Sequence, residues 1–171
     1  MPASLKKHLQ SLTHDELVDE ILKLTKKFRE VKAYYEMDLG DSKQQGALLA
    51  EYKTKLKKLF FPTRGYGDPK ASEVRKIISD FKKISVFPFD VADLLLYRVE
   101  LAVQFTNSYG DIDDRFYAST ETAYEEALKL IETHKLHDHF RERGLMIQEQ
   151  TRHIGWGFSY TMRDLTQKYF N

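Results

Sequence analysis

Apolar residues recur every three or four positions along almost the whole chain, and this spacing limits the folds that it can adopt. Four prolines and eight glycines are spread over 171 residues, so the stretches that carry the spacing are long. Apolar side chains at such intervals share one face of an α-helix, whereas a strand would place them at alternate positions. The sequence therefore predicts an all-α protein of seven or eight helices, arranged as consecutive antiparallel hairpins in a bundle or a short curved stack.

The first long apolar stripe predicts one helix of about six turns. Its members are Leu17, Ile21, Leu24, Phe28, Val31 and Tyr35. Thr13 and Glu16 have the spacing of a capping box at its start, and Gly40 is a suitable stop. A second helix beyond Gly46 would return antiparallel to the first, and a short helix within residues 5–12 would pack on one end.

The segment 61–69 is the clearest linker, because it holds two prolines and two glycines. We expect a single all-helical domain over residues 1–171. Its division into an N-terminal hairpin lobe at 1–60 and a main helical lobe at 70–171 is left open.

The helix expected over residues 91–108 is apolar on most of its surface, which predicts that neighbours cover it on three sides. Arg98 lies about 140° around this helix from the polar stripe that begins at Asp93, so its side chain must cross an apolar interface or extend out of it. An unpaired buried cation is costly, so we expect a carboxylate beside Arg98. The candidates are Asp80, Asp111 and Asp113. A closed pair would be structural, whereas a pair that opens on a cleft would bind an anion.

The segment from Phe105 to Asp114 concentrates polar groups that could hold a hard cation or act in acid-base chemistry. The alternative is structural, with Gly110 ending one helix and Asp113 or Asp114 capping the next. If the segment forms a site, we expect a pocket for an anionic ligand. Its residues would be Arg98, Asn107, Tyr109, Asp111, Asp113 and Trp156.

Other chemistries are excluded or disfavoured by composition. The chain has no cysteine, which excludes disulfide scaffolds and thiolate metal sites. His134 and His137 lie at an expected helix junction without a zinc-binding spacing, so we expect no metal site. We also expect no cofactor and no catalytic residue. The first 85 residues hold 18 basic and 12 acidic side chains, against a net charge of +1 for the whole chain. This excess leaves weak nucleic-acid binding through the first lobe as an alternative.

Residues 78–83, 105–113 and 154–158, together with 5–7 and 15–17, form a set of stretches that extends over nearly the whole chain. These stretches resemble a bacterial family of all-helical proteins of unknown function. The resemblance implies a bacterial, cytoplasmic protein and assigns no catalytic residue. No secretory signal and no membrane-spanning run is expected either.

These observations favour a non-enzymatic helical interaction or regulatory protein that binds a protein partner or associates with itself. A small enzyme or ligand-binding protein for an anionic substrate, with a pocket around Arg98 and the segment 107–113, is the alternative. We expect no membrane partner.

Overall fold

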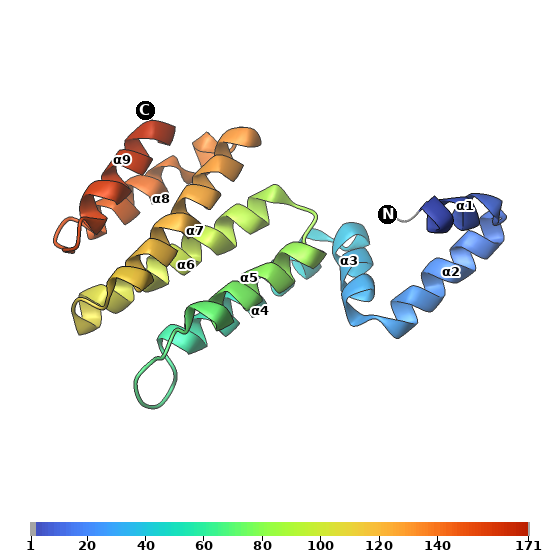
Figure 1. The fold of residues 1–171 in the computed structure, drawn as a ribbon, viewed down its shortest axis with the longest axis horizontal. Coiled ribbons are helices and arrows are strands. Elements are labelled where there is room, and N and C mark those ends of the chain that lie inside the picture. The colour runs from blue at the N-terminus through green and yellow to red at the C-terminus, as the bar shows by residue number, and fades with distance from the viewer. Residues whose placement is uncertain (1–2, 171) are drawn as a thin grey trace.

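The computed structural model describes residues 3–170, and all regular structure within that range is helical. Figure 1 shows the nine helices of this range. They are α1 (Ala3–Ser11), α2 (His14–Lys27), α3 (Arg29–Leu39), α4 (Ser42–Phe60), α5 (Ala71–Ile84), α6 (Pro88–Tyr109), α7 (Asp114–Thr133), α8 (His137–Gln150) and α9 (Phe158–Phe170). The all-α class is confirmed, and the number of helices exceeds the expected seven or eight.

Helix α6 lies at the centre of a body formed by α4 to α9. It packs against α4, α5, α7 and α8, so the prediction of a helix covered on several sides is confirmed. Pro88 occupies its first turn, where a missing N–H costs nothing, and Gly110 ends it with a φ of 90°. Its buried side chains cover more than half of the helix circumference, and the polar stripe that begins at Asp93 occupies the remaining side.

The core of the body is continuous across the segment 61–69. Leu56 and Phe60 of α4 are fully buried in the same cluster as residues of α5, α6 and α7. At Gly67 the chain passes so close to α4 that a Cβ atom would lie 1.9 Å from the carbonyl oxygen of Phe60. The segment therefore connects two helices that share one core, and it is also the irregular linker that its glycines and prolines predicted.

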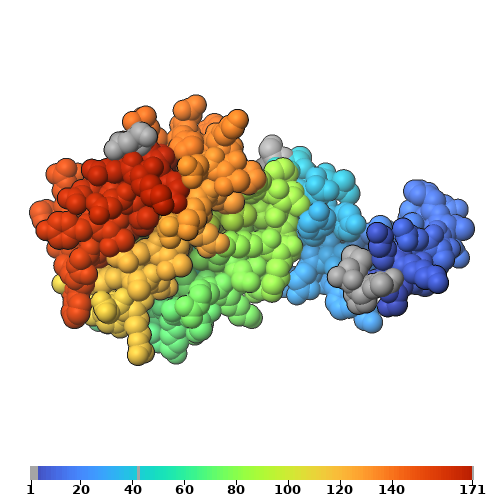
Figure 2. All heavy atoms as spheres, turned by 45° about the horizontal axis from the view of Figure 1, so that its top comes forward, coloured from blue at the N-terminus to red at the C-terminus, as the bar shows by residue number. Residues whose placement is uncertain are grey.

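The N-terminal arm, which we define as α1 and α2, extends away from the body (Figure 1). The single helix expected over the first apolar stripe is wrong, because the chain bends at Phe28, whose φ of −121° and ψ of 117° are extended. Helix α2 contacts α3 and has no buried residue. It therefore does not form the hairpin expected with the helix beyond Gly46, which is α4. Figure 2 shows the arm standing clear of the bulk of the molecule.

Local signals place several helix starts. The capping box at Thr13 and Glu16 is confirmed, since each residue's side chain meets the other's backbone N–H. Helix α4 begins earlier than expected, at Ser42, because the Asp41 side chain accepts a hydrogen bond from the backbone N–H of Gln44 at 2.9 Å. Among the described residues, no helix is both long and apolar enough to cross a membrane.

Candidate functional site

Arg98 is buried in the interior of the body, with 5% of its surface exposed. Its Nη2 atom donates a hydrogen bond of 2.8 Å to the hydroxyl of Ser119 on α7. Its Nη1 atom is buried and has no hydrogen-bond partner within residues 3–170. Burial, followed by the positive charge of Arg75, lowers the pKa of Arg98 to about 10. The fold therefore holds a cation whose charge is poorly compensated.

The guanidinium lines a pocket of about 360 Å³ where α5, α6 and α7 meet. This volume lies within the range of small-molecule sites. The lining combines cations, hydroxyl groups and an apolar floor: Arg75, Ile78, Ser79, Lys82, Leu95, Arg98, Ser119, Thr122, Ala123 and Glu126. Glu126 is the acidic member of this set, and its carboxylate accepts a hydrogen bond from the Lys82 ammonium. The pocket is thus electropositive around Arg98.

The expected carboxylate partner of Arg98 is wrong for the described part of the chain, since each candidate is engaged elsewhere. Asp80 accepts a hydrogen bond of 3.0 Å from Lys83, one turn along α5. Asp111 accepts one of 2.7 Å from the hydroxyl of Tyr117. Asp113 caps α7 by accepting a 2.8 Å bond from the N–H of Phe116. Local partners close in sequence thus hold all three carboxylates away from the interior.

The other residues expected around the ligand do not line the pocket of Arg98. The Asn107 side chain donates a hydrogen bond of 3.1 Å to the carbonyl oxygen of Gln150. Tyr109 packs in an aromatic cluster with its ring centroid 5.0 Å from that of Tyr66. Trp156 has a φ of 59° and is 64% exposed in the loop before α9. A ligand-binding role for these residues, and for Asp111 and Asp113, stays a prediction.

The residues that do accompany Arg98 were not selected from the sequence. Arg75 belongs to the basic stretch of the first half, and Ser119 lies on a helix with many small polar residues. Their spacing carried one usable signal, because Arg75, Ser79 and Lys82 follow each other at four and three residues. Such spacing places the three side chains on one face of a helix. The polar side of α5 could have been matched with Arg98 on that basis.

A second charged cluster joins α6 to α8 and contrasts with Arg98. The Arg143 guanidinium on α8 is bound to Asp93 and to Glu100, with 2.9 Å between Nη2 and Glu100 Oε2. Lys53 adds a bond of 2.7 Å to Asp93. Burial opposes the charge of Arg143, but its bonds to Glu100 and Asp93 outweigh burial and raise its pKa. Each charged group of this cluster has a partner of opposite charge, so the cluster links α8 to α6.

The arrangement at Arg98 has the chemistry of an oxyanion site. A guanidinium offers paired N–H groups that match a carboxylate or a phosphoryl group, and a low-dielectric site strengthens the attraction. An incoming oxyanion would supply the acceptor that Nη1 lacks. Arg75 and the hydroxyls of Ser79 and Ser119 lie within the same lining.

Comparison with known proteins identifies the family of the chain. A family model described as "Family of unknown function (DUF6155)" matches residues 2–170. The chain therefore belongs to this family. The comparisons with curated proteins and with solved structures gave no match.

Proposed function

We propose that this member of the family is a non-enzymatic binding protein that recognises an oxyanion at Arg98, in the pocket between α5, α6 and α7. The observation that carries the proposal is the buried Nη1 atom of Arg98, which has no partner in the described part of the chain and belongs to a residue that lines a pocket of suitable size. A buried cation without a counter-ion destabilises a fold, so its presence is best explained by a ligand that completes it.

The chemistry of the lining favours binding over catalysis. The groups nearest to the proposed ligand are guanidinium, ammonium and hydroxyl groups, which donate hydrogen bonds. Glu126 is held by Lys82 and so is poorly placed to act as a free general base. The oxyanion can belong to a small molecule or to a side chain of a protein partner, and its shared feature is a carboxylate or phosphoryl group beside an apolar portion. The apolar floor of Ile78, Leu95 and Ala123 would contact that portion.

Nucleic-acid binding through the basic stretch receives less support. Lys53 is bound to Asp93, Lys55 to Glu51 and Lys70 to Asp68. Paired lysines contribute less to the release of counter-ions from a phosphate backbone. We therefore keep the oxyanion proposal as the single candidate function.

Isothermal titration with inorganic phosphate and, separately, with acetate tests the proposal. We expect saturable binding of one or both anions by the wild-type chain and loss of that binding in Arg98→Met. An anion present at about ten times its Kd should also stabilise the fold by about 1.4 kcal/mol.

Arg141→Met is the matched control, because Arg141 is an exposed arginine of α8 outside the pocket. This control should bind as the wild type does. Equal binding by wild type and Arg98→Met, or no binding of either anion by the wild type, would contradict the proposal.

A further inference from the structure

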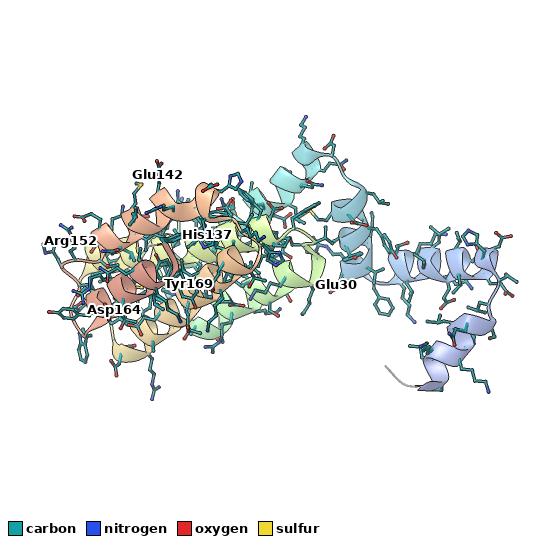
Figure 3. The ribbon with its side chains drawn as sticks, turned by 90° about the horizontal axis from the view of Figure 1, so that it is seen from above. Glu30, His137, Glu142, Arg152, Asp164 and Tyr169 are labelled. Carbon is teal, nitrogen blue, oxygen red and sulfur yellow. The ribbon has the colours of Figure 1, made fainter. Side chains whose placement is uncertain are left out.

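We infer that the N-terminal arm is a self-association surface, on which α2 pairs antiparallel with α2 of a second copy of this chain. The inference is independent of the Arg98 pocket. It starts from the position of the arm, whose side chains project into open space beyond Glu30, near the start of α3 (Figure 3). The arm is thus free to meet another molecule without obstruction by the body.

Helix α2 carries an apolar stripe that remains partly exposed within the described residues of one copy. The stripe consists of Leu17, Ile21 and Leu24 and continues to Phe28, the C-cap residue that follows the helix, with spacings of four, three and four residues. The last three are between 37% and 43% exposed, and Val18 and Leu22 beside them are equally open. This spacing is that of the a and d positions of a two-stranded coiled coil. A stripe of this kind is stable in water when a second helix covers it.

The charges of α2 are divided along its length. Residues 15–20 contain four acidic side chains and no basic one, whereas residues 23–27 contain three lysines and no acid. Within one copy, the salt bridge recorded on this helix joins Glu20 to Lys23 at 3.6 Å, and both side chains remain well exposed. Most of the charges are therefore available to another helix.

An antiparallel pair brings the acidic part of one α2 beside the basic part of the other. When Leu17 faces Phe28 of the second copy, Ile21 faces Leu24 of that copy, so the apolar stripes coincide over their length. In this register Glu20 and Lys27 lie at flanking positions on the same side of the interface, where interhelical salt bridges form. A parallel pair would instead oppose acid to acid and lysine to lysine, which is unfavourable.

This charge pattern also argues for a second copy over a lipid surface. Helices that bind anionic membranes carry mainly lysine and arginine on their polar face. In α2 the acidic residues outnumber the basic ones by one, so the polar face has no excess of positive charge. The self-complementary arrangement of the two halves is the property expected of a two-fold interface.

Sedimentation equilibrium of the full chain at increasing concentration provides the first test. We expect a reversible monomer–dimer equilibrium. A chain that stays monomeric at every concentration up to about 1 mM would overturn the inference, because its Kd for dimerisation would then be weaker than specific pairing requires.

Charge reversal tests which surface forms the dimer. The double variant Asp19→Lys with Glu20→Lys makes α2 predominantly basic, and Lys26→Glu with Lys27→Glu makes it predominantly acidic. Each alone should weaken dimerisation by at least about tenfold, and an equal mixture should restore it as a mixed dimer. Dimerisation by either variant at wild-type strength would overturn the inference.

Two controls separate this effect from unfolding and from net charge. Residues of α2 are not buried, so the thermal unfolding of the body should be unchanged in both variants. The variant Glu149→Lys with Asp164→Lys changes the net charge by the same amount as Asp19→Lys with Glu20→Lys, at exposed positions of the body. It should dimerise as the wild type does, and an equal loss in this control would assign the effect to net charge and overturn the inference.

Orientation is tested with cysteines, which the natural sequence lacks. Glu20→Cys mixed with Lys27→Cys should give a disulfide-linked dimer under oxidation. Neither variant alone should do so, because in this register the two copies of position 20 lie about 8 Å apart along the pair and the two copies of position 27 about 14 Å apart, too far for a disulfide. Cross-linking of each variant with itself but not of the mixture would contradict the antiparallel arrangement.

Discussion

Arg98 and Ser119 join the centre of α6 to α7 through a hydrogen bond of 2.8 Å between Nη2 and the serine hydroxyl. The serine is a neutral partner, so it satisfies one donor without compensating the charge. An interior built for stability alone would place a carboxylate beside Arg98 or replace the arginine by an apolar residue. The pairing of Arg98 with Ser119 therefore favours a role for Arg98 in binding over a role in stabilising the fold. The two roles predict different effects of substituting Arg98 on the free energy of unfolding.

Arg98→Met should raise the free energy of unfolding by about 1 kcal/mol in the absence of added anions. The substitution removes an uncompensated charge and fills a similar volume, and this gain exceeds the loss of one hydrogen bond. Urea denaturation in a buffer without phosphate or carboxylate measures the change. A loss of about 3 kcal/mol or more, as when a buried ion pair is broken, would show that Arg98 stabilises the fold.

Arg75→Gln should weaken anion binding about threefold to tenfold at low ionic strength. Its exposed charge attracts the anion toward the pocket, and the same charge contributes to the lowered pKa of Arg98. Titrations of phosphate at low and at high salt provide the measurement, and the difference from wild type should shrink as salt screens the exposed charge. Lys76→Gln, on the same helix but outside the pocket lining, is the control. Equal weakening in the control would assign the effect to long-range charge.

Arg143→Met should lower the free energy of unfolding by about 2 kcal/mol, because it leaves Asp93 and Glu100 without their main partner. The cost is below that of a fully buried pair, since about a quarter of the Arg143 side chain is exposed. Urea denaturation of this variant beside Arg141→Met checks the value. The control should remain within about 0.5 kcal/mol of wild type. A similar result for both variants would contradict a linking role for the cluster.

Tyr124→Phe should lower stability by about 1 kcal/mol at neutral pH, because the fully buried hydroxyl is 2.8 Å from Thr166 Oγ1. Burial raises the pKa of Tyr124 to about 12 from an ordinary value of 10. Between pH 10 and 12 the unfolded chain loses the Tyr124 proton while the folded chain retains it. The stabilisation that the Tyr124 hydroxyl provides is therefore complete below about pH 10 and is lost as the pH approaches 12.

The advantage of wild type over Tyr124→Phe should therefore narrow between these two pH values. Chemical denaturation of both proteins at matched pH cancels the ionisation of the other tyrosines. An advantage that stays constant across the window would contradict the raised pKa.

Local sequence signals predicted helix starts in both the arm and the body but failed at the bend between α2 and α3. Thr13 with Glu16 and Pro88 place helix starts through contacts between near neighbours, so they can be read without tertiary structure. The bend at Phe28 could not be read, because the apolar spacing continues through it and neither glycine nor proline occurs nearby. Spacing records the helical phase of each residue and contains no information on the direction of successive helices.

The candidate site was predicted in part, at Arg98. Its burial followed from its position among apolar residues of a central helix. The partner of Arg98 could not be predicted, because groups close in sequence bind the expected carboxylates. Asp113 accepts a hydrogen bond from the N–H of Phe116, and Asp111 accepts one from the hydroxyl of Tyr117. The cytoplasmic location and the bacterial source stay predictions.

Crystallography of the full chain with an anion that scatters anomalously, such as selenate, tests the central claim most directly. We predict an anomalous peak in the pocket between α5, α6 and α7, with an oxygen about 2.9 Å from Nη1 of Arg98 and no such peak in Arg98→Met crystals. A wild-type structure in which Nη1 is satisfied by a carboxylate of the chain, with no anion in the pocket, would contradict it.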